Sequence, residues 1–204
     1  MWTSVESGWH DISQPPSMPT LSPITLSSER LLLRGLERSD AVDLLDLYAD
    51  PQVMRYWNHA PWTTLDQAHA AIAEAQSDYA SGVSLHLAIV HRSSGALLGS
   101  CALYGFVPQH RSAAIGYLLS RPHWGQGYLS EALQLLLDYG FDELGLNRIE
   151  ADVDPRNEAS AKALQRLSFH HEGKLREHWF VNGQVRDTAL YGLLCSDWQG
   201  RSSK

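Results

Sequence analysis

The order of strand and helix patterns along the chain constrains its fold more than any other feature of the sequence. Alternating or continuous apolar runs predict strands, and apolar residues spaced three and four apart predict helices. From residue 24 onward the predicted order is strand, helix, helix, three strands, helix, strand, helix and two strands. This order predicts an α/β protein with about four helices against one mixed sheet. Two strand pairs are joined by short polar turns, which predicts two antiparallel hairpins.

The boundaries of these elements follow from caps, turns and periodicity. The predicted strands cover 24–33, 84–91, 96–106, 111–120, 147–153, 171–181 and 185–195. The predicted helices cover 40–49, a segment after Thr63, a segment from Gly125, and 157–167. The first helix should bury Val42 and Leu45, with Leu44 and Leu47 as further candidates, and the spacing of Thr63 and Asp66 suggests a capping box for the second.

Length and composition indicate one ordered domain. The chain has 204 residues, of which 44% are hydrophobic and 19% charged, a balance typical of globular proteins. We expect a domain over 24–198, a tail over 199–204, and a proline-containing extension over 1–23 in which Trp2 and Trp9 are the large apolar residues. The net charge of −7 disfavours nucleic acid as a partner.

Cysteine content and hydropathy favour a cytoplasmic protein. The two cysteines, Cys101 and Cys195, are far apart and lack the spacing of a zinc site, so reduced thiols and no bound metal are expected. Residues 1–23 lack a basic segment followed by an apolar run, and no run of 18 apolar residues occurs. We therefore expect neither a signal peptide nor a membrane span.

A glycine-containing turn precedes the predicted third helix. Gly125, Gln126 and Gly127 lie where backbone N–H groups and the helix dipole favour an anion. A P-loop is excluded, because Gly127 is not followed by Lys and Ser or Thr. A dinucleotide-binding turn is disfavoured because Ser130 replaces its third glycine and Pro122 separates the turn from the strand.

Several spaced motifs resemble one enzyme family. They are Ile115-Gly116-Tyr117-Leu118-Leu119, WGQGYLSEAL from Trp124 to Leu133, Arg148 to Ala151, Asp154 to Ser160, and Leu167 to Phe169 with Glu172 and Gly173. Over roughly residues 24–198 the chain is similar to the GNAT superfamily of acetyl-CoA-dependent N-acetyltransferases. More narrowly, it resembles the RimJ/RimL-type branch, which acetylates protein N-terminal amines. The resemblance implies the GNAT fold, with a mostly antiparallel, splayed sheet, and acetyl-CoA as co-substrate.

The resemblance also assigns residues to coenzyme A. The turn that binds the pyrophosphate in the family falls on Trp124 to Leu129, with Trp124 in place of Gln or Arg and Leu129 in place of a small residue. The implied cofactor residues are Leu118, Leu119, Trp124, Gly125, Gln126, Gly127, Tyr128, Leu129, Ser130 and Asn157. Leu118 and Leu119 match the part of the family's bulged strand that pairs with pantetheine. Asn157 could equally be a plain helix N-cap.

Acyl transfer to an amine needs a group that takes a proton, because an N-terminal amine has a reference pKa of about 7.7 to 8.0. Glu150, Asp152 and Asp154 alternate on one strand and share a face, so at least one can face a cleft. Asp152 matches the place of a catalytic glutamate in some family members, and His110 is a rival base. A glutamate frequent in this branch is replaced by Ala114.

The departing thiolate also needs a partner. Many family members carry a tyrosine at the position of Leu164, whereas Ser160 matches a serine of the RimJ/RimL-like branch. The resemblance therefore implies that Ser160 orients the sulfur or delivers a proton, as an alternative to a plain helix-surface serine. Because neither cysteine lies in a matched motif, direct attack is favoured over an acyl-enzyme route.

The acceptor side is predicted from aromatic content. Residues 51–62 include Met54, Tyr56, Trp57, His59 and Trp62. We expect Trp57 and His59 to lie near the incoming amine. Asp187 orients the acceptor or fixes a turn. The predicted function is acetylation of a primary amine, first of all a protein N-terminal amine. The alternatives are a small amine (polyamine, amino acid or antibiotic) and a catalytically weak acyl-CoA-binding module; no oligomeric state is predicted.

Overall fold

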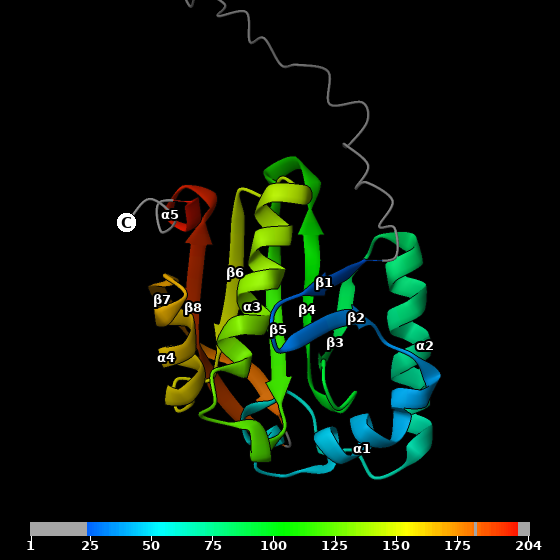
Figure 1. Cartoon of the computed structure of the whole chain (residues 1–204). Helices are drawn as coiled ribbons and strands as arrows, with labels where there is room; N and C mark the ends of the chain where they lie inside the picture. The colour runs from blue at the N-terminus through cyan, green and yellow to red at the C-terminus, as the bar shows by residue number, and fades with distance from the viewer. Residues whose placement is uncertain (1–23, 182, 200–204) are drawn as a thin grey trace, which may run out of the picture.

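An eight-stranded sheet runs through the computed structural model, which describes residues 24–181 and 183–199 (Figure 1). The strand order is β1-β2-β3-β4-β5-β6-β8-β7. Every neighbouring pair is antiparallel except β5 with β6, which is parallel. The prediction of a mixed, mostly antiparallel sheet is confirmed.

The elements have the following bounds. The strands are β1 (Thr25–Ser27), β2 (Leu31–Gly35), β3 (Leu85–His91), β4 (Leu97–Val107), β5 (Ser112–Leu119), β6 (Arg148–Val153), β7 (His170–Val181) and β8 (Gln184–Leu194). The helices are α1 (Ala41–Ala49), α2 (Leu65–Ser81), α3 (Tyr128–Asp138), α4 (Glu158–Arg166) and α5 (Cys195–Gln199). Short helical turns are η1 (Arg38–Asp40), η2 (Met54–Tyr56), η3 (Pro108–His110), η4 (Arg121–His123) and the π-helical η5 (Tyr139–Glu143).

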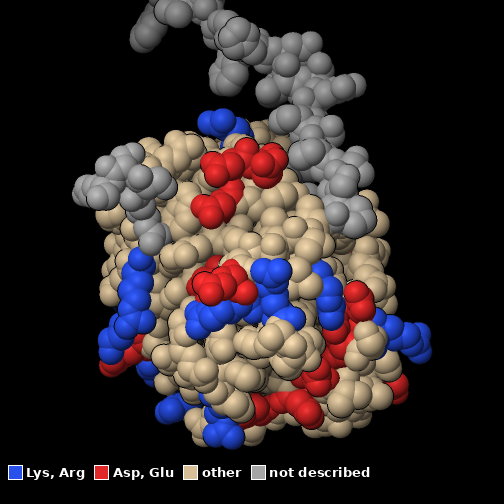
Figure 2. Space-filling view, in the orientation of Figure 1, with Lys and Arg blue, Asp and Glu red and all other residues tan. Residues whose placement is uncertain are grey.

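Helices cover both faces of the sheet. The apolar stripe of α3, represented by Leu133 and Leu136, packs with Leu87 and Ile89 of β3 in one buried core. The neighbouring β3 residues Ala88 and Val90 point to the opposite face and join the core beneath α1 and α2. Figure 1 shows α3 lying in front of the central strands, and Figure 2 shows basic and acidic side chains intermixed over that same face.

The first predicted strand, 24–33, is in fact two strands. β1 and β2 form an antiparallel hairpin, with Thr25 opposite Arg34. Ser28 makes the turn, because its N–H donates to the Leu31 carbonyl at 3.0 Å and its hydroxyl accepts from the Leu31 N–H at 3.0 Å. A serine that bonds the backbone in this way competes with strand pairing. The seven predicted strands therefore become eight.

The helix predictions need three corrections. α1 begins at Ala41, and Val42 is 58% exposed because the buried stripe is offset toward Leu44 and Leu47. The capping box of α2 is formed by Thr64 and its third helical residue, Gln67, rather than by Thr63 and Asp66. A fifth helix, α5, begins at Cys195, where the sequence predicts the end of the last strand.

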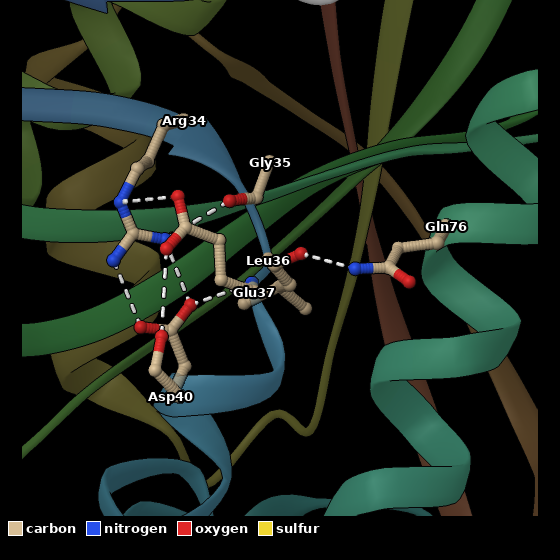
Figure 3. A network of polar contacts seen from close by, with 7 residues as sticks. Arg34, Gly35, Leu36, Glu37, Asp40 and Gln76 are labelled. Carbon is tan, nitrogen blue, oxygen red and sulfur yellow. Dashed lines mark hydrogen bonds and ion pairs between the residues drawn. The ribbon is translucent and has the colours of Figure 1, made fainter.

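A polar network joins β2 to α1 and α2 (Figure 3). Asp40 is 5% exposed, and both its carboxylate oxygens accept from the Arg34 guanidinium at 2.8 Å. The Glu37 N–H also donates to Asp40 at 2.8 Å, and the Gln76 amide donates to the Leu36 carbonyl at 2.9 Å. The network fixes the segment that connects β2 with α1 against α2.

The ends of the chain fall partly outside the described residues. The predicted extension 1–23, with Trp2 and Trp9, lies outside them, as do residues 200–204 of the predicted tail. The domain limits 24–198 stay a prediction. In the part of the chain that is described, no helix is long and apolar enough to cross a membrane.

Candidate active site

The sheet opens between β5 and β6. These parallel strands pair at only three positions, where Ser112 to Ala114 face Arg148 to Glu150. Beyond that point β5 keeps its pairing with β4 as far as Leu119, and β6 keeps its pairing with β8 as far as Val153. The facing edges of β5 and β6 therefore diverge, and their backbone groups are left free for a ligand. This is the splayed sheet that the resemblance implies.

Leu118 and Leu119 lie at the free end of β5, and both are buried. Gly99 of β4 packs directly on this segment, since a Cβ there would stand 2.2 Å from the Leu118 carbonyl oxygen. The register with β4 is regular at this point. The irregular register of that strand pair lies between Tyr104 and Val107, so the bulge is near the other end of β4 and not at Leu118 and Leu119.

The turn before α3 presents backbone donors. Gly125 and Gly127 have φ of 72° and 81°, in the left-handed region that favours glycine. Gly127 is the N-cap of α3, and no side chain caps the helix. The N–H groups of Tyr128, Leu129 and Ser130 belong to the first turn, where the helix itself supplies no acceptor. An anion such as a phosphate fits this arrangement.

Side chains brace the turn before α3. The Trp124 indole donates to the Leu119 carbonyl at 2.7 Å, and the Gln126 amide donates to the Pro122 carbonyl at 2.7 Å. Arg30, which the sequence reasoning missed, donates to the Gln126 carbonyl at 3.1 Å. Its guanidinium also lies 4.5 Å from the centre of the Tyr128 ring. Trp124 and Gln126 thus use their side chains to hold the loop. Arg30 lies beside it and is itself paired with Glu131 of α3, whose carboxylate accepts from Nε of Arg30 at 2.7 Å.

A cavity of about 550 Å³ lies beside the opening. Its lining comes from α1, α2 and the connector between them, from β3 to β6, from the start of α4 and from the β7–β8 hairpin. Of the residues predicted from the sequence, Trp57, His59, Asp152, Asn157, Ser160 and Asp187 line it. The residues of the turn before α3 do not line this cavity, so the two regions form separate parts of one candidate site.

Aromatic rings form the wall on the side of the α1–α2 connector. Tyr48 stacks on Trp62 with ring centres 4.1 Å apart, and it meets Trp57 edge-on at 6.0 Å. Trp57 in turn lies 5.8 Å from His59. Trp57 is half-buried, packing against the core beneath α1 and α2 while also lining the cavity. The structure thus brings together the residues predicted to lie near the amine.

The three alternating acids of β6 have different surroundings. Glu150 does not line the cavity and pairs with Arg148 at 2.7 Å. Asp154 lines it but pairs with Arg156 at 2.6 Å. Asp152 lines the cavity, and its carboxylate has no hydrogen bond or ion pair to another described residue. Burial has the largest effect on the pKa of Asp152 and raises it. A nearby histidine lowers this pKa by less, and Glu150 raises it.

That histidine is His178 of β7, which lowers the pKa of Asp152. The pKa of Asp152 is nevertheless raised overall, and perturbed pKa values of this kind are common at functional sites. The other base considered from the sequence, His110, is exposed on η3 and does not line the cavity. Among the candidate bases, Asp152 therefore has the most suitable position.

Asn157 and Ser160 form a pair at the start of α4. The Asn157 carbonyl oxygen accepts from the Ser160 N–H at 3.1 Å, and its amide donates to the Ser160 hydroxyl at 3.1 Å. Asn157 is therefore the N-cap of α4 and also orients Ser160. Tyr117, which the sequence reasoning did not consider as a site residue, also lines the cavity. Leu164 is fully buried and contributes only packing.

Asp187 fixes the shape of the β7–β8 hairpin. It accepts from the Glu177 N–H at 2.9 Å and pairs with Lys174 at 2.5 Å. Glu177 has a φ of 54°, and the register with β8 shifts between Leu175 and Trp179. Asp187 thus stabilises a bulge in β7, and it also lines the cavity.

Comparison with known proteins identifies the family. A model described as the acetyltransferase (GNAT) domain matches residues 30–170. A Bacillus licheniformis protein, described as the uncharacterized N-acetyltransferase p20, is 39% identical over 176 residues, which cover 86% of this chain and 99% of that protein. The chain belongs to the GNAT family and is an N-acetyltransferase. Enzymes of this family use acetyl-CoA, and the donors of the turn before α3 with Arg30 fit its pyrophosphate.

Two solved structures share the fold of this chain. Spermidine N-acetyltransferase from Vibrio cholerae, solved with CoA and spermine, is 26% identical with a TM-score of 0.75, covering 84% of this chain and 99% of that one. Ribosomal-protein-S5-alanine acetyltransferase from Vibrio fischeri is 22% identical with a TM-score of 0.76, covering 86% and 98%. The second comparison shows only the shared fold. In the residues that the structure describes, no cluster of His, Cys, Asp or Glu could hold a metal ion.

Proposed function

We propose that the protein acetylates a primary amine of a small polycationic acceptor, by direct attack with both substrates bound. The observation that carries this proposal is the set of carboxylates around the cavity. Glu74 and Asp78 of α2 line one end and Asp152 lines the other, and no ion pair joins any of them to a described Lys or Arg. A cavity with such carboxylates and aromatic walls favours ammonium groups.

The separation of these acids favours an acceptor with more than one charge. α2 packs beside β3, and Asp78 accepts a hydrogen bond at 3.1 Å from Ser84, the residue that precedes β3. Neighbouring strands lie about 4.8 Å apart, so β3 and β6 are roughly 14 Å apart across the sheet. One ammonium group can therefore lie near Asp152 while a second lies near Glu74 and Asp78. A linear polyamine has charges with this kind of spacing.

Acetyl-CoA supplies an activated thioester. In the proposed arrangement, the N–H groups of Tyr128, Leu129 and Ser130, with Arg30, bind its pyrophosphate. The free edge of β5 at Leu118 and Leu119 binds the pantetheine arm. The opening between β5 and β6 then joins this region to the cavity.

Asp152 is the proposed general base. Its carboxylate faces the cavity without a partner, and its raised pKa brings it closer to that of the amine from which it takes a proton. Glu150 is a weaker candidate because Arg148 holds it outside the cavity. Ser160, oriented by Asn157, is proposed to contact the thioester sulfur.

A protein N-terminal amine is the second candidate acceptor. The motif Ile115-Gly116-Tyr117 and Ser160 support membership of the RimJ/RimL-like branch, whose members acetylate such amines. An N-terminal amine would also be attacked beside Asp152, but it has no need for Glu74 and Asp78. We place the enzyme in the cytoplasm, where its two free cysteines would stay reduced.

An amine panel followed by thiol release tests these assignments. The panel contains a diamine, a triamine, a tetraamine, an amino acid, an aminoglycoside and N-terminal peptides. We expect kcat/KM for the triamine or tetraamine to exceed that of every peptide by about tenfold or more, one charge–charge contact being worth about that factor. Faster turnover of a peptide would favour the second candidate. Release of no thiol with any amine would leave only an acyl-CoA-binding role.

Variants of the distal acids make the test specific. Glu74→Gln combined with Asp78→Asn should raise KM for the triamine by about tenfold and leave KM for acetyl-CoA unchanged. Glu143→Gln is the matched control, because Glu143 is an exposed acid of η5 that does not line the cavity. An unchanged triamine KM in the double variant would contradict the assignment of the distal end.

A further inference from the structure

Tyr117 carries a buried hydroxyl group without a partner at the opening of the sheet. Among the described residues, three buried side-chain polar atoms lack a hydrogen bond: the Tyr117 hydroxyl, Nε of Arg186 and the Thr188 hydroxyl. Only Tyr117 lies on β5, one of the two strands that border the opening, and it also lines the cavity. An unsatisfied buried hydroxyl is destabilising, and a phenylalanine at this position would avoid that cost. A ligand atom in the opening could accept its hydrogen bond.

The surroundings of Tyr117 place it beside the sulfur side of the site. The Ser160 hydroxyl is close enough to lower the pKa of Tyr117, although the two make no hydrogen bond of normal geometry. Ser160 itself is held by Asn157 at the start of α4. Tyr117 and Ser160 therefore converge from opposite sides of the opening, one from β5 and the other from the helix that follows β6.

We propose that the Tyr117 hydroxyl donates a hydrogen bond to the thioester sulfur as it leaves. This inference rests on the proposed direct transfer but not on the identity of the acceptor. The side chain at position 164, which faces the core from α4, is a fully buried leucine and has no proton to donate. The phenol thus reaches the sulfur from the sheet.

The step balances as follows. The amine nitrogen forms a bond to the acetyl carbon, the carbon–sulfur bond breaks, and its electron pair goes to sulfur. The nitrogen loses one proton to Asp152, and the sulfur accepts a hydrogen bond from the Tyr117 O–H. The proton on Asp152 passes to water, and water returns one proton to the sulfur as the thiol departs. The products are the amide and the free thiol of coenzyme A.

The acidity of Tyr117 fits a hydrogen-bond donor rather than an acid that ionises. Burial raises the pKa of Tyr117 to about 12, against a smaller opposing effect of Ser160. A thiol has a reference pKa of about 8.5, so the phenol keeps its proton while the sulfur is a thiolate. Tyr117 therefore stabilises the thiolate without titrating near neutral pH.

The direct test measures the thiol of bound coenzyme A by the ultraviolet absorbance of its thiolate, which needs no turnover. In the wild-type enzyme the pKa of the bound thiol should lie below that of free coenzyme A, and Tyr117→Phe should raise it by about one unit, equal to a tenfold change in the ionisation constant. Tyr139→Phe is the matched control, because Tyr139 is a partly buried phenol of η5 outside the cavity lining.

Kinetics and folding controls complete the test. Tyr117→Phe should lower kcat by about tenfold to a hundredfold and leave the acceptor KM within about threefold. Its melting temperature should not fall, because the change removes an unsatisfied hydroxyl. A bound-thiol pKa that is the same in both proteins would overturn the proposal. If no amine is acetylated while Tyr117→Phe still raises the bound-thiol pKa, the proposed function fails and the role of Tyr117 stands.

Discussion

The indole nitrogen of Trp124 donates a hydrogen bond to the carbonyl oxygen of Leu119 at 2.7 Å. This bond links the turn before α3 to the last residue of β5. The backbone donors of the turn and the free edge of the strand are therefore held in a fixed relation. A long ligand that binds both regions needs that fixed spacing, because little binding energy is then lost in ordering the protein.

Gly127→Glu should abolish measurable binding of coenzyme A. Gly127 has a φ of 81°, and a side chain there would carry a carboxylate toward Arg30, whose Nη2 lies 3.5 Å from the position that a Cβ would occupy. The carboxylate would repel the pyrophosphate and compete for its cation. Left-handed backbone costs about 1–2 kcal/mol for a residue other than glycine, so the fold should survive. Calorimetry measures the affinity, and an unchanged value would remove the turn from the site.

Asp152→Asn should lower turnover at neutral pH by roughly a hundredfold. Because Asp152 must be ionised to accept a proton, wild-type kcat/KM should rise as pH increases through its raised pKa, and the variant should lose this dependence. The loss should shrink at high pH, where more of the amine is already neutral. A loss under about threefold across the pH profile would transfer the role of base to another group, with Glu150 the next to test.

Trp57→Ala should raise KM for the acceptor and leave KM for acetyl-CoA unchanged. Trp57 lines the cavity, while the turn before α3 lies outside its lining. The ring also packs on Tyr48, so melting should fall by a few degrees. Steady-state titrations that vary each substrate in turn measure the two KM values separately. Constant Michaelis constants together with a large drop in melting temperature would mean that Trp57 serves only the core.

Asp40→Asn should destabilise the fold by about 2 kcal/mol at neutral pH, because Arg34 loses its two charged hydrogen bonds to Asp40 and keeps only the Gly35 carbonyl and the more distant Glu37, at 3.8 Å. Burial raises the pKa of Asp40, but the hydrogen bonds from Arg34 and Glu37 outweigh this and bring it below its usual range. The stability gained from ionised Asp40 is therefore complete above the carboxyl's normal pKa and is lost as pH falls through its lowered value. Denaturant unfolding between neutral and acidic pH should show a smaller pH dependence in the variant than in the wild type.

The sequence could predict the sheet and its helices because their patterns are local. The apolar spacing that begins at Leu129 identifies the buried face of α3, and the structure buries Leu133, Leu136 and Leu137 as expected. The split of residues 24–33 depends on one serine hydroxyl that bonds its own backbone, which periodicity cannot reveal. The prediction that Val42 lies in the core is wrong for a similar reason, since the offset of the buried stripe depends on what packs above it.

The residues of the candidate site also differ in how well the sequence alone predicts them. The turn at Gly125 and Gly127 carries its own signal, because glycines at a strand-to-helix junction indicate left-handed backbone. Arg30 carries none, and Tyr117 belongs to a matched motif that does not reveal the surroundings of its hydroxyl, since both depend on groups distant in sequence. Arg30 contacts Gln126, 96 residues away, and Tyr117 matters because its hydroxyl is buried without a partner.

The opening between β5 and β6 divides the sheet into two blocks. One block contains β1 to β5 and the other contains β6, β8 and β7, and three residue pairs between β5 and β6 connect them. An extended ligand bound along the free edge of β5 would occupy the position of a ninth strand and fill the gap between the two blocks. Amide protons at the end of β5 should then exchange with solvent more slowly once coenzyme A is bound. Bound co-substrate would thereby tie the two blocks together along their whole length, and its departure would leave them joined in the sheet by those three residue pairs alone.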